Sequence, residues 1–229
     1  MCSRREADRF IANGYVFVDK KPITTLGTKI HPDQHIELHP DAERVQQGLV
    51  TILLNKPIGY VSGQAEKGYP SATRLLTRNH YRGPAGGFPN LAPKLSKNFA
   101  PAGRLDIDSK GLLVLTQDGR IAKQLIGGYS EIEKEYLVQV TGSLTSDKIE
   151  ALRHGMALDG QMLKPAEVIR QKGNLLNFTL VEGRKRQIRR MCQLVELEVT
   201  SLTRVRIGKI RLGGLVEGCW RTIGTNEKF

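Results

Sequence analysis

The 229-residue sequence predicts an α+β fold whose main domain is built on a mixed, mostly antiparallel sheet. From residue 49 onward, apolar β-rich runs alternate with amphipathic helical runs, and the strands outweigh the helices. This balance favours a mixed sheet over a doubly wound parallel one. No segment of about 20–50 residues repeats, which excludes solenoids and propellers.

The first 48 residues predict a small α/β module. A helical pattern over residues 3–14 ends at Gly14, a usual helix stop, and short strands are expected at residues 15–18 and 36–38. The polar stretch 41–48 is expected to be a linker. We therefore expect two domains, residues 1–48 and 49–229.

In the second domain the apolar runs predict its core strands and the amphipathic runs its helices. Asp118 is well placed to cap the first of these helices. Between the first two strands lies a Pro- and Gly-rich connection, residues 64–100, with six Lys/Arg against one Glu, which is open to nucleic-acid contact. The expected strands are 49–55, 112–116, 136–140, 175–181 and 199–207, and the expected helices are 119–126, 147–153 and 186–195.

Charge and composition narrow the class of protein. Thirty-five Lys/Arg against 23 Asp/Glu give a net charge of +12, which favours a polyanionic partner. The longest apolar stretch, near residues 50–54, is far shorter than the roughly 20 residues that span a membrane. Five charged residues among the first nine exclude a signal peptide, and three scattered cysteines favour a reducing compartment. We expect a cytoplasmic protein and, in the absence of any heptad pattern, a monomer.

Three histidines, His31, His35 and His39, have a spacing that would place them on one face of a helix. Pro32 and Pro40 interrupt any helix there, so we expect no metal site. The sequence also lacks a P-loop and a GxGxxG motif.

The densest basic segment is 184–211, with nine Lys/Arg against two Glu. A solvated helix face would explain such a run, but cations with so few compensating acids repel one another. Phosphate binding is therefore favoured.

The segment 103–119, GRLDIDSKGLLVLTQDG, is a polar turn with two carboxylates, Asp106 and Asp108, that leads into an apolar strand. A cation such as Arg104 beside a carboxylate lowers its pKa by about 1–3 units. An ordinary loop with an Asx-turn explains the same residues, and composition leaves both readings open.

This segment resembles the catalytic motif of pseudouridine synthases, specifically the RsuA-type branch that modifies ribosomal RNA. Residues 3–22 resemble the S4 RNA-binding domain, although family members have a further helix before it. Ser109 stands where the family has Thr, and 64–100 is longer than in the family. Further motifs agree in order: NKPIG (55–59), KEYLV (134–138), EGRKRQIRRMC (182–192), residues 204–212 and GCWR (218–221).

The resemblance implies a site and a partner. Asp106 matches the essential aspartate, which acts as nucleophile at the glycosidic carbon or as base. Tyr136 matches the tyrosine that stacks on uracil, and Arg189 the arginine that pairs with the aspartate; Asp108 receives no catalytic role. No cofactor or metal is expected. RNA, most of all 23S rRNA with tRNA as a further possibility, is the expected partner, contacted by Arg4, Arg5, Lys56, Arg104, Lys134, Arg184, Lys185, Arg186, Gln187, Arg190, Arg204 and Arg206.

Two functions from different classes compete. The first is an RNA pseudouridine synthase, and the second is a non-catalytic S4-type RNA-binding protein of ribosome assembly. The combination of Asp106, Tyr136 and Arg189 favours the enzyme, because a pure binder does not need it. DNA binding is disfavoured, since no paired-helix pattern of major-groove readers is present.

Overall fold

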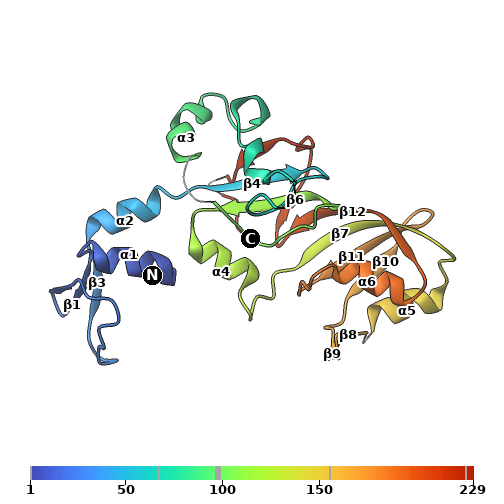
Figure 1. Ribbon diagram of the computed structural model, residues 1–229, viewed down its shortest axis with the longest axis horizontal. Coiled ribbons are helices and arrows are strands. Elements are labelled where there is room, and N and C mark those ends of the chain that lie inside the picture. Colours follow the sequence, from blue (N-terminus) through green and yellow to red (C-terminus); the bar gives the residue numbers. More distant parts are fainter. Residues whose placement is uncertain (1, 67, 96–98, 155, 225) are drawn as a thin grey trace.

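A large sheet forms the centre of the protein, which we describe from a computed structural model covering residues 2–66, 68–95, 99–154, 156–224 and 226–229. Its strand order is β10-β11-β7-β12-β6-β4-β14, with β13 beside β12 and β5 beside β6 (Figure 1). Only the β12–β6 pair among these described strands is parallel, which confirms the mixed, mostly antiparallel prediction. The strands are β4 (Thr51–Lys56), β5 (Ala100–Pro101), β6 (Lys110–Thr116), β7 (Lys134–Thr141), β10 (Glu167–Arg170), β11 (Leu175–Leu180), β12 (Glu198–Ile207), β13 (Ile210–Arg211) and β14 (Trp220–Thr222).

The predicted strands and helices of this part are confirmed to within two residues at each end. Asp118 caps α4 as expected, because its Oδ1 accepts a hydrogen bond of 2.8 Å from the Arg120 N–H. The helices are α3 (Gly87–Leu95), α4 (Gly119–Ile126), α5 (Ser146–Arg153) and α6 (Gln187–Leu194), with short 3₁₀ turns at Ala72–Leu75 and Arg78–His80 and a small hairpin of β8 (Ala157–Leu158) and β9 (Gln161–Met162).

The neighbouring strands β4 and β6 bury apolar side chains on both faces of the sheet. Leu113 and Leu115 point to a core under the segment between β4 and β5, whereas Leu112 and Val114 point to the core against α4. A third core lies between α5, α6 and the β7–β11 end of the sheet. Since successive side chains of a strand face opposite sides, this double burial places β6, and the loop that precedes it, in the middle of the molecule.

The N-terminal module contains a helix, a three-stranded sheet of order β2-β1-β3, and a second helix. Ser3 and Glu6 form a capping box at the first helix, and Gly14 follows its end with φ +71°. The predicted linker over residues 41–48 is wrong: the stretch is helical, because Pro40 is tolerated in a first helical turn and His39 caps it. The elements are α1 (Arg4–Ala12), β1 (Val16–Val18), β2 (Lys21–Ile23), β3 (Ile36–Leu38) and α2 (Pro40–Gln47).

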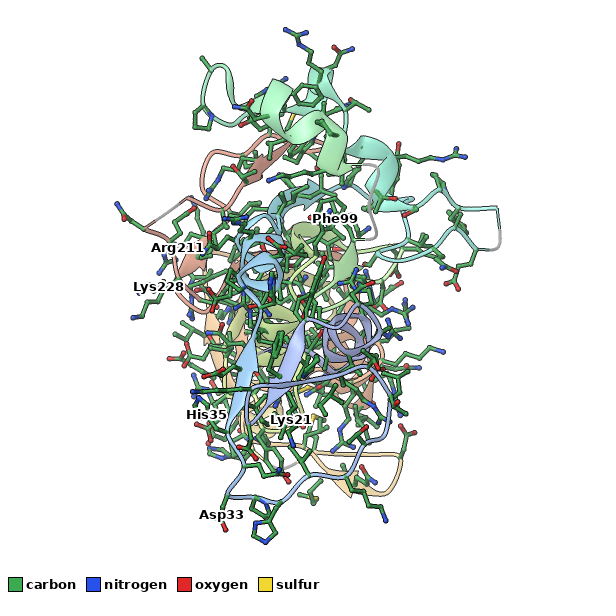
Figure 2. All side chains as sticks on the ribbon, turned by 90° about the vertical axis from the view of Figure 1, so that its left-hand side faces the viewer. Lys21, Asp33, His35, Phe99, Arg211 and Lys228 are labelled. Atoms are coloured by element: carbon green, nitrogen blue, oxygen red, sulfur yellow. The ribbon has the colours of Figure 1, made fainter. Side chains whose placement is uncertain are left out.

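The module lies against the start of α4. A Cβ on Gly119 would lie 2.3 Å from the Cβ of Ser3, and Arg120 donates to the Gln46 side chain at 3.4 Å. Asp33 and His35 lie at the outer end of the module, away from this contact (Figure 2). Within the described ranges, no helix is long and apolar enough to cross a membrane, and no group of His, Cys, Asp or Glu side chains could hold a metal ion.

Candidate active site

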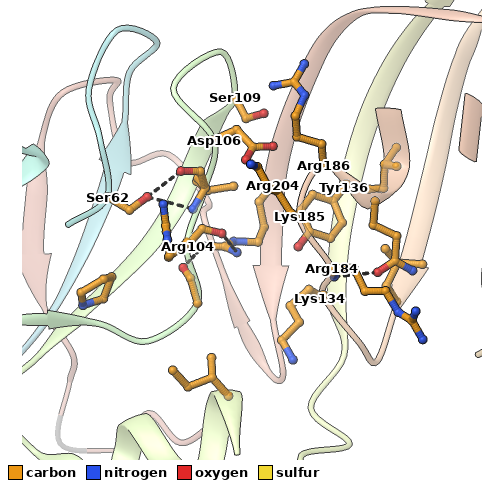
Figure 3. A pocket seen from close by; sticks show the side chains of 18 of the residues that line it. Ser62, Arg104, Asp106, Ser109, Lys134, Tyr136, Arg184, Lys185, Arg186 and Arg204 are labelled. Carbon is orange, nitrogen blue, oxygen red and sulfur yellow. Dashed lines mark hydrogen bonds between the residues drawn. The ribbon is translucent and has the colours of Figure 1, made fainter. Parts of the chain in front are cut away.

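A cleft of about 1,200 Å³ opens where β6, β7 and β12 meet (Figure 3). The loop before β6, the start of β7 and the loop before α6 line it. Small-molecule sites usually enclose about 300–1,000 Å³, so this cleft is large enough for part of a macromolecule.

The register of the sheet brings the cleft residues together. Tyr136 on β7 is opposite Arg204 on β12, and Arg204 is opposite Gly111 on β6. The guanidinium of Arg204 is 6.0 Å from the centre of the Tyr136 ring, and it donates to the carbonyls of Leu112 at 2.7 Å and Gly103 at 3.0 Å. Arg204 thus joins the tyrosine to the loop that carries Asp106.

Asp106 is held by its backbone, while its carboxylate stays available. Ser109 N–H donates to the Asp106 carbonyl at 3.1 Å. The buried Ser62 hydroxyl donates to the Leu105 carbonyl at 2.7 Å and accepts from the Leu105 N–H at 2.8 Å. Among the described residues, none donates a hydrogen bond to the Asp106 carboxylate, which interacts electrostatically with Lys56 and Arg186. This carboxylate is free to react in the cleft.

Arg189 pairs with Asp108, so the expected pairing with Asp106 is wrong in this structure. Its Nε lies 3.3 Å from the Asp108 carboxylate, its Nη2 donates to the Asp108 carbonyl at 2.8 Å, and its Nη1 donates to the Val199 carbonyl at 3.0 Å. The two carboxylates are two residues apart on one turn, and only the folded turn decides which of them faces α6. Arg189 therefore ties the loop 102–109, which carries Asp106 and which we call the catalytic loop, to α6 and β12.

Asp108, which the sequence left without a role, also binds Arg186 through two hydrogen bonds of 3.0 and 2.9 Å. Burial raises the pKa of Asp108, but the hydrogen bonds from Arg186 and the charges of Arg189 and Arg186 outweigh it and hold this pKa below its usual value. Asp108 and Ser62 are the organising residues that sequence reasoning missed. For Asp108, the available signal was its position beside Asp106 in a motif followed by an arginine-rich helix.

Five of the twelve expected RNA-contact residues carry a cation that has no acidic partner in the part of the chain that the structure describes. Arg4 and Arg5 are exposed on α1, while Arg104 and Lys185 are exposed in loops that line the cleft. Lys134 lines the same cleft but is only 9% exposed, and burial and the charge of Arg204 lower its pKa to about 8. These five residues are placed to meet phosphates.

Three others are buried and make hydrogen bonds within the fold, and the RNA contact expected of them stays a prediction. Lys56 is fully buried and donates to the carbonyls of Pro57 and Tyr60, and burial lowers its pKa to about 8 despite the charge of Asp106. Gln187 and Arg204 are 4% and 2% exposed. A sequence shows the charge or polarity of such residues but not the carbonyls that take their hydrogen bonds.

The remaining four are exposed in part but have protein partners. Arg186 is bound by Asp108, Arg190 by Asp159 at 2.7 Å, and Arg206 by Glu135 at 2.6 Å. Arg184 donates to the β8–β9 hairpin, at Gln161 and Met162. These ion pairs and hydrogen bonds compete with any phosphate.

Comparisons with known proteins agree with this architecture. Residues 50–194 match the family model described as RNA pseudouridylate synthase, and residues 1–36 match the S4 domain. The chain belongs to the RNA pseudouridylate synthase family, a family of isomerases, and the expected resemblance to its RsuA-type branch is confirmed.

Individual relatives cover nearly the whole chain. The dual-specificity RNA pseudouridine synthase RluF of Escherichia coli (strain K12) is 35% identical over 99% of this chain and 73% of its own length. Ribosomal large subunit pseudouridine synthase B of Yersinia pestis is 32% identical over 95% of this chain and 67% of its own length. A crystal structure of a pseudouridylate synthase superposes with a TM-score of 0.66 at 25% identity, covering 97% of this chain and 90% of that one.

Proposed function

We propose that this protein converts a uridine of 23S rRNA into pseudouridine, with Asp106 as its catalytic residue. One observation carries the proposal: a carboxylate and a tyrosine ring share a cleft with cations at its rim, and neither the carboxylate nor these cations have a charged partner within 4 Å among the residues that the structure describes. The choice of RNA rests on the relative named for the large ribosomal subunit, and tRNA is a second candidate substrate.

The chemistry requires only groups that the cleft supplies. The glycosidic bond between C1′ and N1 breaks, a bond between C1′ and C5 forms, C5 loses its proton and N1 gains one. Product and substrate are isomers, so no cofactor has to supply electrons or a transferred group. Asp106 either attacks C1′ or takes a proton from the ribose.

The uridine must leave its stack before it reaches Asp106, which costs a few kcal/mol. Stacking on the Tyr136 ring recovers about 1–3 kcal/mol of that cost. The buried guanidinium of Arg204 lies 6.0 Å from the centre of this ring. Arg189 acts as a positioning residue, since it donates one hydrogen bond to the loop that carries Asp106 and another to Val199 on β12.

We assign phosphate binding to Arg4, Arg5, Arg104, Lys134 and Lys185. We also propose that the chain consists of two domains, residues 1–48 and 49–229. The separate sheets of these two parts support this division. A cytoplasmic monomer is the proposed working form, because the proposed substrate is ribosomal RNA and the sequence has no heptad pattern.

The test is to incubate the protein with unmodified transcripts of 23S rRNA, 16S rRNA and tRNA that carry tritium at uridine C5. Isomerisation must release this hydrogen, so we expect release from 23S rRNA. Asp106→Asn should abolish release while its RNA Kd stays within a few fold, because the amide keeps the shape but neither attacks nor accepts a proton. A wild-type protein that binds these RNAs and releases no tritium would instead be a non-catalytic RNA-binding protein.

A further inference from the structure

One aromatic side chain of the cleft has no role in the proposed reaction. Tyr69 lines the same cavity as Asp106 and Tyr136, and it is 43% exposed. Its side chain has no hydrogen-bond or ring partner among the residues that the structure describes. Tyr69 belongs to the long connection between β4 and β5, the segment whose function the sequence left open.

The loop that carries Tyr69 is fixed at its base. Val61 N–H donates to the Pro70 carbonyl at 3.0 Å, and Ala72 N–H donates to the Val61 carbonyl at 2.8 Å. Tyr69 N–H donates to the Glu66 carbonyl at 2.9 Å. These hydrogen bonds hold the backbone on both sides of Tyr69 before any ligand arrives, so ordering this backbone adds little to the entropy cost of binding.

The same loop is joined directly to the catalytic loop. Ser62 exchanges two hydrogen bonds with the backbone of Leu105, the residue before Asp106. Ser62 and Tyr136 lie on opposite sides of Asp106 (Figure 3). The position of Tyr69 is therefore set relative to Asp106, on a loop that starts from the wall opposite the Tyr136 platform.

We propose that Tyr69 is a second stacking platform, which holds the base of a nucleotide next to the flipped uridine. Flipping one base removes a stacking partner from each neighbour, and a neighbouring base then needs a new surface. A tyrosine ring offers that surface to any base, because stacking does not depend on the base's hydrogen-bonding edge. A phosphate is the wrong occupant for this position, since Glu66 lines the cavity beside Tyr69 and repels anions.

This inference rests on the proposed function, and it is tested by RNA affinity, which does not require turnover. The Kd for the unmodified 23S rRNA transcript is measured for Tyr69→Ala, Tyr69→Phe and Tyr69→Leu. We expect Tyr69→Ala to raise this Kd by about 5- to 150-fold, the range that loss of one stacked base produces. Tyr69→Phe should stay within about twofold of wild type, because the ring and not the hydroxyl carries the interaction.

Tyr129 provides a matched control, because it is a fully exposed tyrosine that does not line the cleft, and Tyr129→Ala should leave the Kd unchanged. Wild-type affinity in Tyr69→Ala, or equal affinity of the Leu and Phe variants, overturns the stacking role. Absence of tritium release by the wild type overturns the proposed function instead, and the two failures are therefore distinguishable.

Discussion

Asp106 and Asp108 differ in role because their surroundings differ, although only one residue separates them. Asp108 is held by Arg186 and Arg189 and cannot easily act on a substrate. Asp106 has its backbone fixed and its carboxylate unengaged among the described residues, which suits a group that must attack or accept a proton. Arg186 and Arg189 therefore restrain the loop that carries Asp106 by binding Asp108.

That arrangement predicts the effect of Arg189→Met. The variant loses the hydrogen bonds to the carbonyls of Asp108 and Val199, so the catalytic loop loses its anchor. A displacement of about 1 Å of a catalytic group can cost roughly 100-fold in rate, and we expect a loss of this order in single-turnover rate at saturating RNA. Lys should rescue it only in part, having one point charge in place of a planar fork.

The adjacent variant Arg190→Met is the control, because Arg190 pairs with Asp159 and not with the catalytic loop. Its saturated rate should stay near wild type. If Arg189→Met raised only the Kd and left this rate unchanged, Arg189 would be a phosphate contact and not a positioning residue.

Lys134 predicts a pH dependence of RNA binding. Burial and the charge of Arg204 lower its pKa to about 8, so the ammonium loses its charge as the pH rises through that value, and affinity for phosphate falls. We expect the Kd to rise by roughly tenfold between pH 7 and 9, which corresponds to the loss of about one hydrogen bond from a charged group. A bound phosphate raises the pKa of Lys134, so part of this rise occurs at higher pH. Filter binding over this range measures it.

Lys134→Arg should remove this pH dependence, because arginine keeps its charge throughout the range. Should the dependence persist in Lys134→Arg, the titration of Lys134 would not be its cause.

At the scale of elements, the parallel pairing of β6 with β12 depends on a glycine. Gly111 has φ +106°, and a Cβ there would lie 2.3 Å from the carbonyl oxygen of Arg204. We expect Gly111→Ala to lower the free energy of unfolding by about 2–5 kcal/mol, from backbone strain and overpacking together. Urea denaturation followed by circular dichroism measures this loss.

Gly63→Ala is the comparison, since Gly63 has no positive φ and no atom within 4 Å of the added Cβ. It should change stability by less than about 0.5 kcal/mol. A similar small change in Gly111→Ala would mean that the β6–β12 pair can move apart at no cost.

Elements with a clear hydrophobic period could be predicted from the sequence, and elements that depend on distant contacts could not. β6 and α6 have apolar residues at strand and helix spacing, so their positions follow from local pattern. The folded part of segment 64–100 is held instead by Tyr81 packing on Trp220, 4.8 Å between ring centres and 139 positions apart in number. Nothing within the segment itself indicates that partner.

The same distinction applies to the site. Asp106 and Tyr136 could be found because a contiguous motif contains each of them. The partner of Arg189 and the burial of Arg204 could not, since both depend on how β12 and the catalytic loop approach each other. Charge alone therefore suggested more RNA contacts than the folded protein leaves free.

At the scale of the whole molecule, the S4 module and the catalytic cleft both carry exposed cations that have no acidic partner in the described part of the chain, and α4 lies between the two. α1 begins against α4, and the end of α4 contributes Ile126 to the lining of the cleft. An RNA that places a uridine at Asp106 can therefore continue along α4 to the exposed Arg4 and Arg5 on α1. The module then contributes affinity, while the chemistry remains in the catalytic domain.

This division of labour predicts the behaviour of the double variant Arg4→Gln/Arg5→Gln. Two lost phosphate contacts should reduce the slope of log K against log salt by about 1.4–1.8, because each contact releases somewhat less than one counterion. The single-turnover rate at saturating RNA should stay at the wild-type value, since neither residue touches the cleft. Lys20→Gln/Lys29→Gln removes the same charge from exposed positions elsewhere in the module and should leave the slope almost unchanged. Equal slopes for the two double variants would mean that the module acts only through net charge, and a reduced saturated rate in Arg4→Gln/Arg5→Gln would mean that it helps to position the uridine.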